Sequence, residues 1–180
     1  MISDLIIKEE VGPGNVPKAL FISSIEEFVG DRPVYGILEN IQLLNRKYKI
    51  MESSIKTQQE YLIAKIPDIE LAIESVFQRK KLLNNLNKNE LYFPVSDNLF
   101  AKCSSPPSNT IYLWLGANTI LEYPLEEAIE VLKSNLSTAK NTIKLYQESL
   151  DFIREQITIM DVNTARVHNY GVMQRKQNKV

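Results

Sequence analysis

The stretch TIYLWLGANTILEY, residues 110–123, differs in pattern from the long segments on either side of it. Apolar and aromatic residues alternate from 111 to 115, and this period of two is typical of a β-strand. The Gly-Ala-Asn sequence at 116–118 suits a tight turn, because glycine and asparagine tolerate the positive φ that such turns require. Residues 119–123 return as a second strand, and Pro124 can open a helix. We therefore predict an apolar β-hairpin inserted into a mostly helical chain.

The composition of the 180-residue chain is that of a folded protein of ordinary size, with 44% apolar and 24% charged residues. No apolar run approaches the roughly 20 residues that a membrane helix needs. The net charge of −1 arises from interspersed residues of both signs, so no basic face for nucleic acid is expected. Cys103 is the single cysteine, and residues 1–15 lack the pattern of a signal peptide. These features predict a cytoplasmic protein.

The two ends of the chain are predicted to be tails. Glycine and proline cluster at 12–17, so we expect residues 1–19 to form a flexible N-terminal tail. A single folded domain at 20–175 follows, and residues 176–180 form a short C-terminal tail.

Two capping patterns precede the long helical region. Ser24 and Glu27 match a capping box, which predicts a short helix at about 24–30. Asp31 can cap the next helix, and Pro33 is tolerated in its first turn.

The first long helix is predicted at 31–89. Its apolar stripe follows the three-and-four spacing of a coiled-coil seam and comprises Val34, Ile37, Ile41, Leu44, Tyr48, Met51, Ile55, Gln58, Leu62, Ile66, Ile69, Ile73, Val76, Lys80 and Leu83. Two successive steps of four, from Gln58 to Ile66, form a stutter that locally unwinds a coiled coil. Pro67 either kinks one helix or divides two helices, and the continuing stripe favours a kink.

The second long helix is predicted at 124–169. Its stripe alternates steps of four and three without interruption through Leu125, Ile129, Leu132, Leu136, Ala139, Ile143, Tyr146, Leu150, Ile153, Ile157, Met160, Thr164 and Val167. A sustained repeat of 3.5 residues requires a supercoiled partner. The two helices should therefore fold back on each other as an antiparallel coiled coil, with residue 62 opposite about 150 and residue 44 opposite about 168.

The region between the helices is predicted to contain two β-hairpins, at 90–104 and 110–123, which makes the fold class α+β but mainly α. Two isolated hairpins have open edges and cannot bury their own apolar side chains. We therefore expect them to assemble with strands of other chains through Tyr92, Phe93, Leu99, Phe100, Ile111, Leu113, Trp114, Leu115, Gly116, Asn118, Ile120 and Leu121.

The order helix, two hairpins, helix resembles an α-type subunit of the prefoldin family, in particular the von Hippel–Lindau-binding type. A β-type subunit would have a single hairpin. The match extends over about residues 16–175 and is carried by VPKALF at 16–21, KYKIME at 47–52, IPDIE at 66–70, DNLFAKCSSPPSN at 97–109, LWLGANTILEY at 113–123, NLSTA at 135–139 and ARVHNY at 165–170. Thr119 and Pro124 depart from the pattern, where a branched apolar and an acidic residue are usual.

This resemblance implies a heterohexamer of two α-type and four β-type subunits, built around a double β-barrel from which six coiled coils project. It implies that the distal coiled-coil ends hold unfolded actin or tubulin and deliver them, without nucleotide, to the cytosolic chaperonin TRiC/CCT. It also implies the von Hippel–Lindau protein as a partner and the nucleus as a second compartment.

Holding an unfolded client needs exposed, shallow apolar groups. The candidates near the free helix ends are Phe21, Ile22, Phe28, Val34, Tyr35, Leu38, Met160, Val162 and Val167. Several of these side chains could instead close the end of the coiled coil.

Two other classes of function were weighed. A coiled-coil adaptor or scaffold subunit without holding activity would need the heptads but not two apolar hairpins. An enzyme is disfavoured, because the sequence has no phosphate-binding glycine loop, no metal-ligand spacing and no acid–base constellation, and His168 is the single histidine. We expect no catalytic, cofactor or metal site, no nucleic-acid partner and no membrane association.

Overall fold

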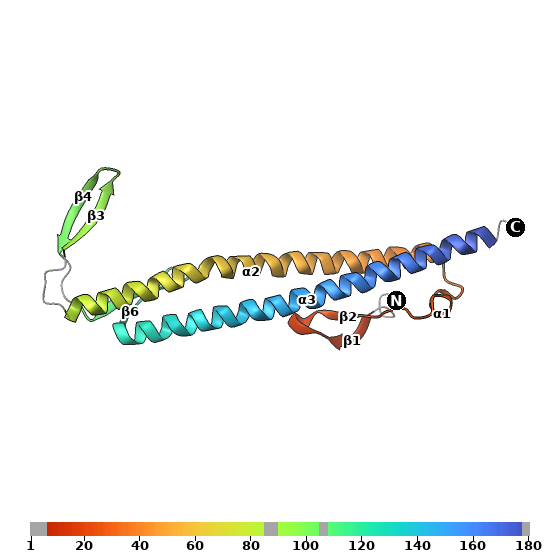
Figure 1. Cartoon of the computed structure of the whole chain (residues 1–180), viewed down its shortest axis with the longest axis horizontal. Coiled ribbons are helices and arrows are strands. Elements are labelled where there is room, and N and C mark those ends of the chain that lie inside the picture. The colour runs from red at the N-terminus through yellow and green to blue at the C-terminus, as the bar shows by residue number, and fades with distance from the viewer. Residues whose placement is uncertain (1–6, 85–89, 105–107, 178–180) are drawn as a thin grey trace. The chain divides into compact units, whose positions relative to one another are not determined.

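The computed structural model of the chain describes residues 7–84, 90–104 and 108–177. It is mainly α-helical with short antiparallel β-hairpins, as predicted, and it divides into two compact units. The first unit comprises residues up to 62 and from 141 onward, and the second comprises residues 63–140. Two long helices, α2 (Val34–Asn84) and α3 (Leu125–Gln177), contribute to both units (Figure 1).

Helix α2 is continuous through Pro67, so the proline does not divide it into two helices. The helix begins at Val34, three residues after the predicted start, and its last described residue is Asn84. The predicted extension to 89 lies outside the described residues.

Helix α3 continues to Gln177, about two turns beyond the predicted end near 169. Gly171 lies just beyond the predicted end and is buried inside the helix, where α2 approaches it. A Cβ atom at Gly171 would lie 2.7 Å from Val34 Cγ1, so only glycine fits without a shift. The glycine therefore allows close helix packing in the first unit and does not end α3.

One predicted seam position in α2, Gln58, is wrong in the first unit. Gln58 is exposed, whereas Gln59 is half-buried and donates hydrogen bonds to the Ile143 carbonyl at 3.4 Å and to Gln147 at 3.1 Å. The two successive steps of four therefore run from Met51 through Ile55 to Gln59, about two turns earlier than predicted. A glutamine is tolerated at this seam position because its side-chain amide forms hydrogen bonds with α3.

The helices of the first unit are antiparallel, as predicted, but their register differs from the prediction. Asn45 donates a 2.6 Å hydrogen bond to Asp161, and Arg154 pairs with Glu52 at 3.2 Å. Residue 44 therefore lies opposite a position about six residues before 168. The contact of Gln59 with Gln147 shows the same shift of about six residues for the predicted pairing of 62 with 150.

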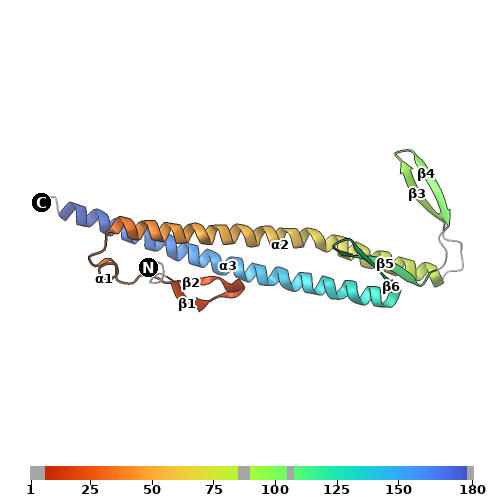
Figure 2. The same cartoon turned by 180° about the vertical axis from the view of Figure 1, so that it is seen from behind.

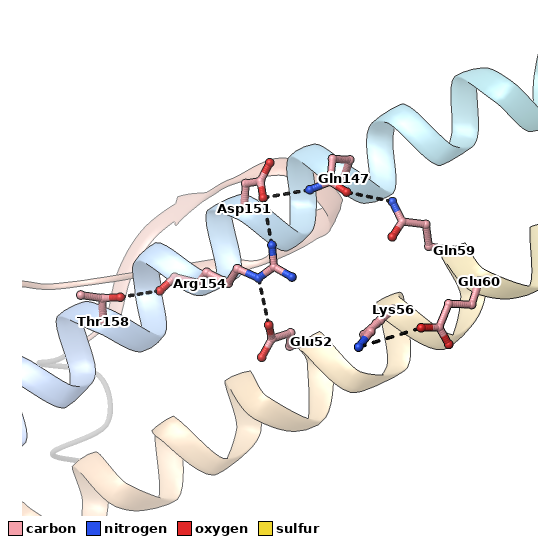
Figure 3. Close-up of polar contacts among 8 residues, drawn as sticks. All are labelled: Glu52, Lys56, Gln59, Glu60, Gln147, Asp151, Arg154 and Thr158. Carbon is pink, nitrogen blue, oxygen red and sulfur yellow. Dashed lines mark hydrogen bonds and ion pairs between the residues drawn. The ribbon is translucent and has the colours of Figure 1, made fainter. Parts of the chain in front are cut away.

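Exposed polar side chains form a row along one side of this helix pair (Figure 3). Arg154 bridges Glu52 on α2 and Asp151 on its own helix, with distances of 3.2 and 3.3 Å. Gln147 joins Asp151 to Gln59. Exposed ion pairs add at most about 1 kcal/mol each, so this row sets register more than it adds stability.

The N-terminal region differs from the predicted flexible tail. Strand β1 (Ile7–Val11) pairs antiparallel with β2 (Pro17–Ala19), and a short 3₁₀ helix, η2 (Pro13–Asn15), connects them. Figures 1 and 2 both show this hairpin beside α3. The side chain of Val16 is fully buried and that of Ala19 is 3% exposed. Burial of apolar side chains on the helices therefore orders a segment that glycine and proline alone would leave flexible.

The predicted short helix is confirmed as α1 (Ile25–Val29). Ser24 is its N-cap and accepts a hydrogen bond from the Glu27 amide. Gly30 ends it with a φ of +49°, and the Gly30 amide donates to the Glu26 carbonyl at 2.9 Å.

The second unit contains the two predicted hairpins. Strand β3 (Glu90–Ser96) pairs with β4 (Leu99–Ser104), and β5 (Thr110–Gly116) pairs with β6 (Thr119–Pro124). The register of β3 shifts between Pro94 and Ser96, which is the irregularity that a proline within a strand predicts. A separate buried cluster of this unit consists of Val76, Leu125, Ala128 and Ile129.

Candidate assembly and client-binding surfaces

The β5–β6 hairpin has two different faces. Leu113 lies opposite Leu121, and Ile111 lies opposite Tyr123. Of these, Ile111, Leu113 and Tyr123 pack against the buried cluster around Leu125. This face attaches the hairpin to the helices of its own chain.

The opposite face of β5–β6 presents large apolar side chains to solvent. Trp114 lies opposite Ile120, and Tyr112 precedes Trp114 by two residues on the same face. Tyr112, Trp114 and Ile120 are 68%, 63% and 54% exposed. A monomeric soluble protein rarely leaves such a group of neighbouring large apolar residues uncovered.

The turn of this hairpin also matches the prediction. Gly116 pairs with Thr119, so Ala117 and Asn118 are the two turn residues, and both have positive φ. This backbone pattern is that of the tight turns whose twist fits a two-residue hairpin.

The β3–β4 hairpin exposes large apolar side chains on both faces. Tyr92 lies opposite Lys102 and Phe93 lies opposite Ala101, so the two aromatic side chains point to opposite faces. Both are exposed by about two thirds, and Leu99 and Phe100 at the start of β4 are exposed to a similar extent. A two-stranded sheet cannot cover either face by itself.

The predicted assembly residues therefore fall into two groups. Tyr92, Phe93, Leu99, Phe100, Trp114, Leu115, Asn118, Ile120 and Leu121 are exposed, whereas Ile111, Leu113 and Gly116 are half-buried. Ile111 and Leu113 face their own helices, which strand alternation together with the attachment of Pro124 to α3 could have indicated. The prediction omitted Val95 and Tyr112, which are exposed by 58% and 68% and continue the same alternation.

In the first unit, the nine predicted client-binding residues divide by burial. Ile22, Met160 and Val167 are at most 3% exposed and belong to the core, so they are corrected from surface to core residues. Phe28, Val34 and Leu38 are half-buried against that core. Phe21, Tyr35 and Val162 are exposed by 48%, 79% and 40%. Three of the nine side chains are therefore exposed and available for client contact, and six are buried or half-buried at the end of the coiled coil.

Shallow cavities flank the exposed residues of the first unit, one with a mainly apolar lining and one with a mixed polar and apolar lining. One of about 370 Å³ lies between the start of α2 and the end of α3 and is lined by Pro33, Val34, Tyr35, Leu38, Gly171, Gln174 and Arg175. Another of about 330 Å³ lies between α1 and α3 and includes Ile25, Tyr170 and Met173. Met173 is 64% exposed, and the prediction missed it because the helix was ended too early.

Side chains of α3 hold residues 16–23, which we call the N-terminal segment, through its backbone. The Ala19 amide donates to Gln156 Oε1 at 3.0 Å, and the Ile22 amide donates to Asn163 Oδ1 at 3.1 Å. Asn163 Nδ2 donates back to the Leu20 carbonyl at 2.8 Å.

Two further side chains complete these contacts. Arg166 donates to the carbonyls of Ile22 and Ser23, and its guanidinium lies 5.0 Å from the centre of the Phe21 ring. Tyr48 on α2 donates to the Pro17 carbonyl at 2.8 Å. Burial raises the pKa of Tyr48 to about 12, so its hydroxyl remains a donor throughout the physiological range.

Electrostatics in the second unit are modest. Lys80, a predicted polar seam residue, donates a 2.7 Å hydrogen bond to Glu126 Oε1. This hydrogen bond and the positive charge of Lys80 lower the pKa of the Glu126 carboxyl. Among residues 7–84, 90–104 and 108–177, no group of three potential metal-ligating side chains is found. No helix within these ranges combines the length and apolarity needed to cross a membrane.

The sequence pattern of the family described as Prefoldin, prefoldin subunit, matches residues 39–170. The chain therefore belongs to the prefoldin family.

Curated relatives narrow the comparison. The chain is 34% identical over 186 residues to prefoldin subunit 3 of Homo sapiens, a match that covers 98% of this chain and 94% of the human protein. It is 38% identical over 169 residues to probable prefoldin subunit 3 of Schizosaccharomyces pombe, covering 93% and 97% of the two chains. Prefoldin subunit 3 of Drosophila melanogaster is 35% identical over 164 residues, covering 89% and 83%.

A solved structure supports the fold. A chain of filamentous PFD from Methanocaldococcus jannaschii, determined by cryo-electron microscopy, aligns with a TM-score of 0.52 over 66% of this chain and 95% of its own length. Their sequences are 14% identical, so the likeness concerns the fold alone.

Proposed function

We propose that this chain is an α-type subunit of a heterohexameric prefoldin co-chaperone with two α-type and four β-type subunits. The β3–β4 and β5–β6 hairpins form the joint with the other prefoldin subunits. The first unit holds unfolded actin- and tubulin-like clients and passes them to the chaperonin TRiC/CCT without nucleotide or catalysis. From the resemblance to prefoldin subunits, we also propose that the protein is found in the cytoplasm and the nucleus and that it binds the von Hippel–Lindau protein.

The observation that carries the assembly part is the exposure of large apolar side chains on both hairpins. Trp114 and Ile120 form a cross-strand pair in which both side chains are more than half exposed, and Tyr92 and Phe93 point to opposite faces of β3–β4. Neighbouring subunits can cover these faces and also pair the open strand edges.

Client holding is supported by the exposed apolar residues of the first unit. Phe21, Tyr35 and Met173 are about half exposed or more; Tyr35 and Met173 line shallow cavities, and Phe21 belongs to the N-terminal segment. Shallow apolar sites bind weakly and with little sequence preference, as a holdase requires. Several such sites in one hexamer can bind a client tightly through effective concentration.

The test combines mass measurement with client capture. The full chain is mixed with the other prefoldin subunits, and the mass and subunit ratio of the complex are measured. A six-subunit complex with two copies of this chain that suppresses aggregation of denatured actin is expected. A soluble complex that assembles but captures no client would favour the alternative, a coiled-coil adaptor or scaffold without holding activity.

A further inference from the structure

Three buried polar residues on α3 are spaced by seven residues: Ser149, Gln156 and Asn163. They are 3%, 2% and 0% exposed, so they form a second, polar row beside the apolar seam. Seven residues of helix rise about 10.5 Å, and three residues of extended chain span about 10 Å. An extended segment parallel to α3 can therefore meet this row at every third residue.

The N-terminal segment follows this register. Ala19 bonds Gln156, and Ile22, three residues later, bonds Asn163, seven residues later. The register is not kept at Ser149: Gly14, five residues before Ala19, approaches it so closely that a Cβ atom there would lie 2.7 Å from Ser149 Oγ, and the Ser149 hydroxyl donates to the Leu145 carbonyl. The side chains of Val16, Ala19 and Ile22 are buried between the helices at the same spacing of three.

The hydrogen bonds of Gln156, Asn163, Arg166 and Tyr48 with this segment all go to backbone atoms, and the one side chain that these groups contact is the ring of Phe21, beside Arg166. Backbone groups are the same in every polypeptide, so these contacts select an extended conformation and not a sequence. The buried side chains add a requirement for small or branched apolar residues at every third position. An unfolded protein contains many such segments.

We propose that the polar row and its flanking residues Tyr48 and Arg166 form a groove that binds an extended apolar polypeptide segment. Residues 16–23 occupy the groove in the free chain, and a segment of an unfolded client takes their place. This inference rests on the proposed client-holding function and identifies where and in which conformation a client segment binds. Release of residues 16–23 also uncovers the apolar core side chains of Ile153 and Met160, which adds binding surface.

The first experiment follows displacement in the wild-type complex. Denatured actin is added to the assembled complex, and hydrogen exchange is measured at the Ala19 and Ile22 amides, which are both hydrogen-bonded and buried. Exchange at these amides is expected to accelerate at least tenfold when the client is bound. Unchanged protection in a complex that holds actin would overturn the groove proposal and leave client holding intact.

The second experiment measures the groove directly with a labelled synthetic peptide of residues 14–24, GNVPKALFISS. The complex carries full-length chain with Ile22→Asp, which introduces a charge into the core and expels the N-terminal segment. Ser23→Asp is the matched control, because the Ser23 side chain is exposed and its carbonyl contact with Arg166 is retained.

The peptide is expected to bind the Ile22→Asp complex at least tenfold more tightly than the Ser23→Asp complex, and denatured actin should compete for it. Adding Asn163→Leu to Ile22→Asp should reduce peptide binding about tenfold while the helical content measured by circular dichroism is retained. Equal binding to both aspartate variants, or no competition by bound actin, would refute the groove. If no form of the complex holds actin, the proposed function fails, and the peptide result still decides whether the groove exists.

Discussion

The Ile22 amide donates a 3.1 Å hydrogen bond to Asn163 Oδ1, although 141 residues separate the two in the chain. Asn163 is fully buried, and its Nδ2 donates to the Leu20 carbonyl at 2.8 Å. One asparagine thus satisfies a backbone donor and a backbone acceptor of the N-terminal segment. Within the N-terminal segment only residues 17–19 lie in a strand, β2, so the backbone groups of Leu20 and Ile22 depend on Asn163 for their partners.

Asn163→Ala should release the N-terminal segment without unfolding the helices. Removing the amide leaves the Ile22 N–H and the Leu20 carbonyl without partners, which costs about 2–3 kcal/mol of docking free energy. Limited proteolysis between residues 7 and 23 should accelerate at least tenfold in the full-length chain.

Thr158→Ala is the control for this variant, because it removes an exposed hydroxyl that bonds only the Arg154 carbonyl four residues earlier. Its proteolysis rate should equal that of the wild type. Equal rates for Asn163→Ala and wild type would show that apolar burial alone holds the segment.

Substitutions at two neighbouring positions on β5 should have different effects, one on assembly and the other on the stability of the chain. Trp114 is 63% exposed on the outer face, whereas Leu113 packs against the buried cluster around Leu125. Trp114→Asp should prevent assembly with the other subunits and lower the unfolding free energy of the chain by less than about 1 kcal/mol. Leu113→Asp should lower it by about 2–4 kcal/mol, because it places a charge against an apolar cluster.

Native mass measurement and thermal unfolding distinguish the two effects. Ala117→Asp adds the same charge at the exposed turn, outside the predicted assembly residues, and should affect neither measurement, because aspartate also tolerates positive φ. A wild-type mass for the Trp114→Asp complex would place the assembly joint elsewhere.

The sequence predicted the elements of this fold well where the pattern was long and repeated. The heptads located α2 and α3, and the two alternating stretches located four strands, because both periods directly reflect which side chains can face a common partner. The resemblance carried by LWLGAN and LEY added the family. All of these signals lie within single elements.

The errors concern relationships between distant segments. The N-terminal hairpin at residues 7–19 is ordered because its apolar side chains are buried against α3, and glycine and proline content does not predict this burial. The predicted exposure of Ile22 and Met160 was wrong for the same reason, because Ile22 of the N-terminal segment and Met160 of α3 belong to one buried cluster. The spacing of Ser149, Gln156 and Asn163 could have indicated this burial. Three uncharged polar residues seven positions apart lie on one side of a helix and can form a second row of contacts.

A double-mutant cycle should measure the close approach of the helices at Gly171. Gly171→Ala alone should destabilise the chain, because its Cβ would lie 2.7 Å from Val34 Cγ1 and a β-branched side chain in a helix has little freedom to move. In a Val34→Ala background the clash is absent, and Gly171→Ala should stabilise by up to about 1 kcal/mol through helix propensity. Thermal unfolding of all four chains gives the coupling, and additive effects would contradict the close packing.

Tyr48→Phe should reveal the burial of the Tyr48 hydroxyl through the pH dependence of stability. Near neutral pH the variant should lose about 1 kcal/mol, the worth of the 2.8 Å hydrogen bond to the Pro17 carbonyl. Burial raises the pKa of Tyr48 from 10.0 to about 12, so the unfolded chain loses this proton first as pH rises. The wild-type advantage is therefore fully present below pH 10 and decreases by on the order of 2 kcal/mol as the pH rises through the folded pKa. Urea unfolding of both chains at pH 8 and pH 11 measures this difference, and a constant difference between the two chains would show that the hydroxyl is accessible to solvent.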